Sequence, residues 1–287
     1  SDESGKCENH GQSNLRKIKR GRSRACLILA GIHAYLGFHV IERQVIFVDL
    51  ALAQIAVLGA SFALILGHSF DSVESYWLSL MFTIIGAAIF SLTRFKKQRI
   101  PQEAIIGITY AVSAALLVIV LSRSAEGDEQ IKQALVGNIL LVSRPEVIKV
   151  FIIYSAIGAF HFIFRDRFLL ISKNPQQAFQ KGLNVKWWDF LFYVSFGFVV
   201  TSSVKIAGVL LVFSFLIVPS VCAMLFSDQL RTRLVIGWVV GFSASVLGIA
   251  VSYYFDFPTG ASVVCVFGVM LLGMGLVKKI IYLTTHC

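Results

Sequence analysis

The sequence has few charged residues for its length. Only 15% of its 287 residues are Asp, Glu, Lys or Arg, against roughly 25% in a soluble globular chain. Beyond the first two dozen residues this excludes intrinsic disorder, which requires low hydropathy together with high charge. It also argues against a soluble enzyme, because the apolar share of 56% is more than one water-exposed domain holds.

Cysteine is also sparse, and its spacing excludes two classes of site. The five cysteines are Cys7, Cys26, Cys222, Cys265 and Cys287, and no two have the C-x-x-C spacing of a zinc or redox site. Cys222 and Cys265 lie inside apolar runs, where cysteine behaves as a small core residue. A disulfide framework is not indicated.

Long apolar runs dominate the rest of the chain, whose mean hydropathy is +0.76. A bilayer crossing takes about 20 apolar residues. The sequence therefore predicts an all-α, polytopic integral membrane protein with about nine transmembrane helices, or eight if the first span is incomplete. The candidate spans are residues 25–46, 47–67, 76–93, 102–122, 147–164, 188–204, 206–226, 234–254 and 261–282.

Two segments do not fit this pattern of full spans. Residues 1–24 are polar and basic and read as an N-terminal tail preceding the transmembrane domain, residues 25–287. The run from Ile131 to Val142 is too short to cross and is expected to lie in the interface or to re-enter the membrane. The first span is itself marginal, with about sixteen mostly apolar residues before Glu42.

The excess of basic residues predicts an orientation. The net charge is +10, and because the basic residues cluster in short loops, they indicate topology and contact with anionic lipid rather than nucleic acid. With alternating crossings and a cytoplasmic C-terminus, fourteen Lys and Arg fall on cytoplasmic loops and five on external ones. The seven in the N-terminal tail then fall on the external side, against the rule. The cytoplasmic set is Arg43, Arg94, Lys96, Lys97, Arg99, Arg165, Arg167, Lys173, Lys181, Lys186, Arg231, Arg233, Lys278 and Lys279.

Polar side chains at membrane depth are candidate functional residues, because burying them is costly. The second span holds Asp49 and Gln54, which are five residues apart and therefore point in different directions from a regular helix. Each has a structural alternative: Asp49 as a capping carboxylate at the start of the span, and Gln54 as a hydrogen-bonding group between helices.

Histidines in two spans are further candidates. His33 and His39 lie in the first span, and imidazole suits zinc and other first-row metals, although a lone histidine in an apolar helix is more often a packing residue. His161, at the cytoplasmic edge of the fifth span, and Lys205, near the outer boundary, are expected to snorkel to the interface.

Two loops between the spans carry distinct signals. Glu126, Asp128 and Glu129 form an external acidic loop that attracts cations, or is simply a solvated loop. In the cytoplasmic loop NPQQAFQKGLNVKWWD, Asn174 can cap a helix with Pro175 at its first position and Gly182 after its end. We expect a helix of about two turns within residues 174–184. Its apolar residues suit docking to a partner or contact with lipid headgroups; they are Ala178, Phe179 and Leu183.

The order of these motifs resembles the integral-membrane permease of ABC importers for zinc, manganese and iron, over roughly residues 27–280. The segments that carry the resemblance are HVIERQVIFVDLALAQIAVLG (39–59), QEAIIGITYAVSAALLVIVL (102–121), EGDEQIKQALVGNILLV (126–142), NPQQAFQKGL (174–183), VKIAGVLLVFSFLIVPSVCAML (204–225) and DFPTGASV (256–263).

The resemblance implies a homodimeric permease in the cytoplasmic membrane of a bacterium. It implies that the cytoplasmic helix, here Pro175 to Leu183, fits a cleft in a separate ATP-hydrolysing subunit, and that an extracytoplasmic binding protein delivers a divalent metal. The chain itself is then not an enzyme and binds no cofactor beyond the transported metal. In agreement, the sequence contains no G-x-x-x-x-G-K-[ST] phosphate loop. The alternative is a secondary metal transporter driven by an ion gradient.

The second span departs from the family pattern. Relatives show an Asp followed four residues later by a His, both facing the translocation path. Aligned on Gly59, Gln54 takes the place of the histidine and Leu50 that of the aspartate, with Asp49 one residue early. We expect Asp49 and Gln54 to line the path, helped by His33 or His39. Oxygen ligands in place of nitrogen favour harder cations such as manganese or iron(II) over zinc.

Overall fold

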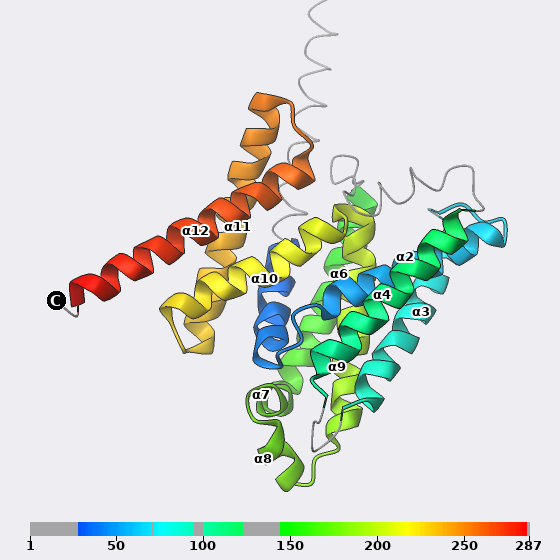
Figure 1. Cartoon of the computed structure of the whole chain (residues 1–287), viewed down its shortest axis with the longest axis horizontal. Coiled ribbons are helices and arrows are strands. Elements are labelled where there is room, and N and C mark those ends of the chain that lie inside the picture. The colour runs from blue at the N-terminus through cyan, green and yellow to red at the C-terminus, as the bar shows by residue number, and fades with distance from the viewer. Residues whose placement is uncertain (1–27, 71, 95–99, 123–143, 286–287) are drawn as a thin grey trace, which may run out of the picture.

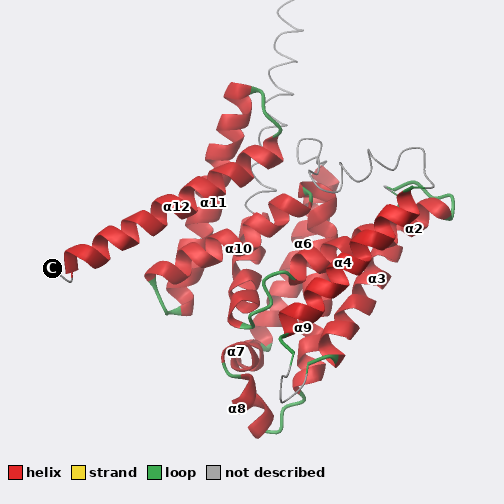
Figure 2. Ribbon diagram, in the orientation of Figure 1, coloured by secondary structure: helices red, strands yellow, loops and turns green. Residues whose placement is uncertain are grey.

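The computed structural model describes residues 28–70, 72–94, 100–122 and 144–285, and within these ranges it contains helices and loops only (Figure 2). Eight helices are long and apolar enough to cross a membrane, which confirms the predicted all-α, polytopic architecture. They are α2 (Val48–Ile65), α3 (Val73–Leu92), α4 (Gln102–Leu121), α6 (Arg144–Ile163), α9 (Val185–Ala207), α10 (Val209–Phe226), α11 (Leu230–Phe255) and α12 (Thr259–Thr285). The N-terminal tail, the run from Ile131 to Val142 and the acidic loop with Glu126, Asp128 and Glu129 lie outside the described residues.

The first predicted span is a shorter helix, Ile28–Glu42, called the first helix below. At 1.5 Å per residue this described part is about 22 Å long, and it begins at the first residue that the structure describes. The turn that follows includes Gln44 with a positive φ of 57° and leads directly into α2.

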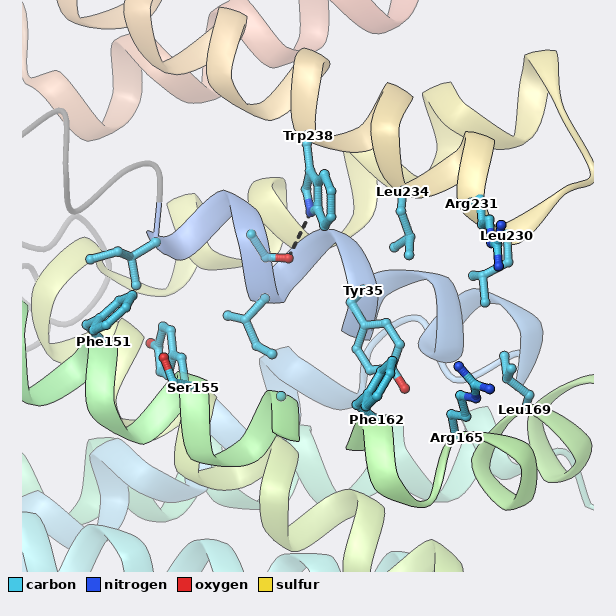
Figure 3. Close-up of a pocket in the computed structure, with 15 residues that line it drawn as sticks. Tyr35, Phe151, Ser155, Phe162, Arg165, Leu169, Leu230, Arg231, Leu234 and Trp238 are labelled. Carbon is cyan, nitrogen blue, oxygen red and sulfur yellow. Dashed lines mark hydrogen bonds between the residues drawn. The ribbon is translucent and has the colours of Figure 1, made fainter. Parts of the chain in front are cut away.

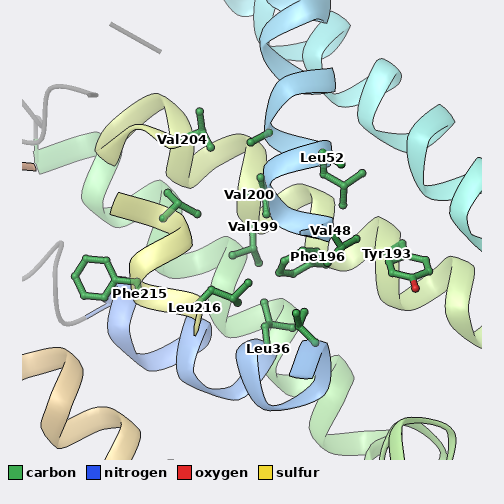
Figure 4. Close-up of a cluster of buried hydrophobic side chains, with 14 of the residues drawn as sticks. Leu36, Val48, Leu52, Tyr193, Phe196, Val199, Val200, Val204, Phe215 and Leu216 are labelled. Atoms are coloured by element: carbon green, nitrogen blue, oxygen red, sulfur yellow. The ribbon is translucent and has the colours of Figure 1, made fainter. Parts of the chain in front are cut away.

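Helix α2 occupies the centre of the larger helix group. It packs against α3, α4 and α9 (Figure 1), and 72% of its residues are buried inside the chain. Figure 4 shows the core around it, where Leu52 faces Val200 and Phe196 of α9, and Leu36 of the first helix lies near Leu216 of α10. Any polar side chain on α2 is therefore placed among several helices rather than in lipid.

Close approach of the first helix to α10 depends on a glycine. A Cβ added to Gly37 would lie 2.0 Å from the carbonyl oxygen of Leu216, a distance no side chain can occupy. Small residues at such crossings let helix backbones pack in a membrane, where no hydrophobic effect drives helices together. The first helix is in this way fixed against α10.

The remaining two long helices extend away from this group. α11 and α12 pack on α10 and on each other, and α12 projects from the body of the chain (Figure 1). Only 17% of the most apolar 18-residue stretch of α12 is buried inside the chain.

The loops that the charge count assigns to the cytoplasmic side lie together at one end of the helices, and loops assigned to the external side lie at the other end. At one end, Arg43, Arg94 and Asp189 meet in ion pairs, and the short helices α7 (Arg165–Lys173) and α8 (Pro175–Gln180) lie beside α9. At the other end, the Nζ of Lys149 lies 4.6 Å from the ring centre of Tyr76. The alternating topology and the geometry therefore agree.

Candidate functional site

A buried ionic cluster joins three segments at the predicted cytoplasmic end. The guanidinium of Arg43, which follows the first helix, donates to Oδ1 of Asp189 on α9. The Nε of Arg94, just after α3, lies 3.0 Å from Oδ2 of the same carboxylate. The side chains of Arg43 and Asp189 are both 0% exposed and that of Arg94 is 5% exposed. Since one carboxylate is shared by two cations, Asp189 holds the three segments together.

Ser172 connects this cluster to α7. The Nε of Arg43 donates to the Oγ of Ser172 at 2.8 Å, and Nδ1 of His39 lies 2.8 Å from the same oxygen. A guanidinium can only donate, so the hydroxyl accepts from Arg43 and its own hydrogen can be donated to His39. α7 is thereby linked through one buried hydroxyl to the end of the first helix.

His39 and His161 lie together beside this cluster, within a group of aromatic rings. Their ring centres are 6.3 Å apart, and the ring of Tyr35 lies 4.7 Å from His39 and 5.6 Å from His161. Nε2 of His161 is 2.8 Å from the Oγ of Ser195, and its ring stacks on Phe168 at 4.3 Å. The snorkelling role expected for His161 is wrong, because this side chain is fully buried.

Helix α8 is present where the sequence predicts it. The side chain of Asn174 accepts from the backbone N–H of Gln177 at 3.0 Å, and Pro175 is at the first helical position. Gly182, the second residue after the helix, has a φ of 74°, a left-handed conformation that glycine adopts without strain.

The apolar side of α8 faces the chain itself, which changes how a partner would meet it. Ala178 is fully buried, and Phe179 and Leu183 are half-buried against the core. The exposed residues of this segment are polar: Gln176, Gln177, Gln180 and Lys181. The expected apolar docking patch therefore fastens α8 to the rest of the chain, and the outward surface is a polar one.

Asp49 and Gln54 occupy α2 in different surroundings. Asp49 is 1% exposed and its Oδ1 accepts from the N–H of Leu50 at 2.8 Å, whereas the N-cap position belongs to Phe47. Gln54 is half-buried. Nearby, Oε1 of Glu103 on α4 accepts from the N–H of Phe47 at 2.9 Å. Because α2 is an unbroken helix, Asp49 and Gln54 do not face one point.

The two histidines of the first helix, His33 and His39, have different surroundings. His33 is fully buried, with Nδ1 2.7 Å from the carbonyl oxygen of Leu29 and Nε2 3.3 Å from the Oγ of Ser203. Both of its nitrogens are thus engaged. Nε2 of His39 has no hydrogen-bond partner among the residues described. Within the same residues, no group of three or more His, Cys, Asp or Glu side chains is arranged to hold a metal.

The remaining predicted residues are those of the acidic loop and Lys205. Glu126, Asp128 and Glu129 lie outside the described residues. Lys205 lines a small pocket of about 50 Å³ near the outer end of α9, together with the hydroxyl-bearing residues Ser75, Ser79 and Thr201.

Sequence reasoning missed Asp189 as a central residue. It is the one acid in the apolar run WWDFLFYVSF, which is a signal of the kind that marked Asp49. Its partners were out of reach of any pattern, because Arg43 is 146 positions away along the chain.

Comparison with known proteins now adds to this geometry. The model of the ABC 3 transport family matches residues 22–278. The chain belongs to the ABC 3 transport family. It is a multi-pass membrane protein.

Curated relatives cover most of this ABC 3 chain. A manganese transport system membrane protein, MntC, of Listeria monocytogenes is 29% identical over 199 residues, which are 67% of this chain and 70% of the relative. A probable iron transport system membrane protein of Haemophilus influenzae is 25% identical over 236 residues, 82% of this chain and 81% of the relative.

A solved structure has the same fold. PsaBC from Streptococcus pneumoniae, solved in complex with Fab, superposes with a TM-score of 0.75 and 23% identity, covering 90% of each chain. The arrangement of helices described above is therefore the fold of that solved chain.

Proposed function

We propose that this chain is the permease subunit of an ATP-driven ABC importer that carries a divalent metal ion, manganese, iron or zinc, across the cytoplasmic membrane of a bacterium. The observation that carries the proposal is the family match over residues 22–278, supported by relatives named for manganese and iron transport. The sequence lacks the phosphate loop of a P-loop ATPase, so ATP hydrolysis is assigned to a separate subunit.

The same proposal includes two partners besides the ATPase. An extracytoplasmic binding protein delivers the metal, and a second copy of the chain completes a homodimer. Only 17% of the most apolar 18-residue stretch of α12 is buried inside the chain, so its outer surface is covered by lipid or by such a second copy.

The metal path is proposed to run beside α2. Asp49 supplies a carboxyl group that is buried at the start of this helix, and Gln54 a side-chain oxygen further along it. Of the two histidines in the first helix, His39 is the better candidate ligand, because the Nε2 atom has no hydrogen-bond partner among the described side chains, whereas His33 uses both nitrogens. The oxygen donors favour manganese or iron(II).

The ionic cluster provides a physical route from the ATPase to this path. Only Asn174 separates α8 from α7, and α8 precedes α9. α7 carries Ser172 and α9 carries Asp189, and both side chains bind Arg43, which lies six residues before Asp49. A displacement of α8 by the ATPase therefore reaches Arg43 through two buried polar contacts, and the start of α2 through the turn that follows Arg43.

The test is growth and metal uptake in a bacterial strain that lacks its own manganese, zinc and iron importers. Expression of this chain with the ATPase and binding protein encoded beside it should restore uptake of at least one of the three metals. The variant Asp49→Ala should insert into the membrane at normal levels and restore none. Restoration by the permease without the ATPase would instead indicate a secondary transporter driven by an ion gradient.

A further inference from the structure

An apolar groove runs along the outside of the helix group, between the first helix, α6 and α11. It has a volume of about 690 Å³, within the range of roughly 300–1,000 Å³ that holds a drug-sized ligand. Figure 3 shows Phe151 and Ser155 of α6 at one end, and Tyr35, Phe162 and Trp238 along its length. The indole N–H of Trp238 donates to the carbonyl oxygen of Gly31 at 3.1 Å, which fixes this ring against the first helix.

The other end of the groove is basic. Arg165, at the start of α7, and Arg231, at the start of α11, lie there beside Leu169 and Leu230 (Figure 3). Among the described residues that line the groove, none is acidic. Within the described part of the chain, Arg165 forms one ion pair, with Asp166 at 3.7 Å, and both side chains are exposed, at 58% and 93%. Such a surface pair is weak, so Arg165 remains available to an anion.

Both arginines lie at the starts of helices that follow the membrane boundary, and the charge count places both on the cytoplasmic side. The groove thus has an apolar length bounded by three membrane helices and a pair of cations at the level of the cytoplasmic headgroups. Basic pockets between membrane helices on this side are typical binding sites for anionic lipid headgroups, and arginine makes paired hydrogen bonds to phosphate.

We propose that this groove binds an anionic phospholipid of the cytoplasmic leaflet, with an acyl chain along the apolar length and the phosphate between Arg165 and Arg231. The charge pattern favours a lipid over a second copy of the chain, because the phosphate of a lipid supplies the negative charge that Arg165 and Arg231 attract. It also distinguishes anionic from zwitterionic lipids. The lipid would pack the first helix against α6 and α11.

The experiment measures lipid retention by native mass spectrometry of the purified, delipidated permease. Phosphatidylglycerol and phosphatidylethanolamine with identical acyl chains are added separately. We expect the unchanged chain to retain phosphatidylglycerol preferentially. The double variant Arg165→Gln/Arg231→Gln should bind it roughly thirtyfold more weakly. Each basic residue near an anionic headgroup contributes about 1 kcal/mol of binding free energy, and the loss of two such residues corresponds to roughly a thirtyfold weaker affinity. The matched control Lys278→Gln/Lys279→Gln removes two cytoplasmic charges from α12, outside the groove, and should retain it.

A second pair of variants tests the apolar length with both arginines in place. Gly158 lines the groove and a Cβ there meets nothing within 4 Å, so Gly158→Leu should fill the space and displace the lipid without disturbing the fold. Gly107 of α4 is equally open but lies outside the groove, and Gly107→Leu should have no effect. Millimolar inorganic phosphate should not compete, because it lacks the acyl chain.

Three results would overturn the proposal. The first is equal retention of the two lipids by the unchanged chain. The second is undiminished retention by both the arginine and the Gly158→Leu variants. The third is a disulfide between two copies of a Gly158→Cys chain in membranes, which would place a second protomer in the groove.

Discussion

Replacing Asp189 by asparagine should destabilise the protein more than most single substitutions. The change keeps the size of the side chain and removes the charge shared by Arg43 and Arg94, which are 0% and 5% exposed. At the 3.0 Å between Arg94 Nε and Asp189 Oδ2, an effective dielectric constant near 20 gives an attraction of about 5.5 kcal/mol for that pair alone. Loss of one partner from a buried pair costs about 3–5 kcal/mol, and here two cations lose theirs.

The assay follows the buried thiol of Cys222. In a chain whose other four cysteines are replaced by serine, a thiol-reactive dye reports unfolding as this side chain becomes accessible. The Asp189→Asn variant should melt well below its parent. Adding Arg94→Gln should recover part of the loss, because one unpaired buried cation is then removed. A melting temperature for Asp189→Asn within about 1 °C of the parent would refute the reasoning, since even 1 kcal/mol shifts it by more than that.

Three further predictions concern single positions. Gly37→Ala should lower stability by about 1–3 kcal/mol, because its methyl group meets the backbone of α10, while Gly31→Ala in the same helix, where a Cβ meets nothing within 4 Å, should be tolerated; thermal unfolding distinguishes them. Gln54→His should raise the ratio of zinc to manganese uptake, since imidazole suits zinc better than an amide oxygen; an unchanged ratio in transport assays would remove this residue from the path. Ser172→Ala should reduce metal-stimulated ATP hydrolysis in the assembled transporter, whereas Ser214→Ala, a buried serine bonded within its own helix, should leave it unaltered.

The sequence predicted the membrane helices well because their signal is local. A run of about 20 apolar residues is sufficient to identify a span, so all eight long helices were expected. The capped helix after Asn174 was equally local, since its start depends on neighbouring residues.

The inward faces of these helices could not be predicted in the same way. Lipid is as apolar as a protein core, so the pattern of apolar residues does not say which side of a membrane helix is buried. For this reason the sequence predicts an interfacial place for His161, which is fully buried. Ala178, on the cytoplasmic helix α8, is also fully buried, because an apolar pattern does not say whether a helix face meets a partner or its own chain. The partners of Asp189 come from other helices, and no spacing along the chain brings them together.

The central claim is that this permease couples metal movement to a separate ATPase through α8 and the Asp189 cluster. Its most direct test is a proteoliposome assay with the chain, its ATPase and its binding protein, in which ATP hydrolysis and uptake are recorded together for manganese, iron and zinc. The account predicts that metal-loaded binding protein stimulates hydrolysis, that uptake requires ATP, and that Ser172→Ala leaves hydrolysis without metal intact while it reduces the stimulation. Uptake of equal rate without ATP, or no stimulation by any of the three metals, would contradict it.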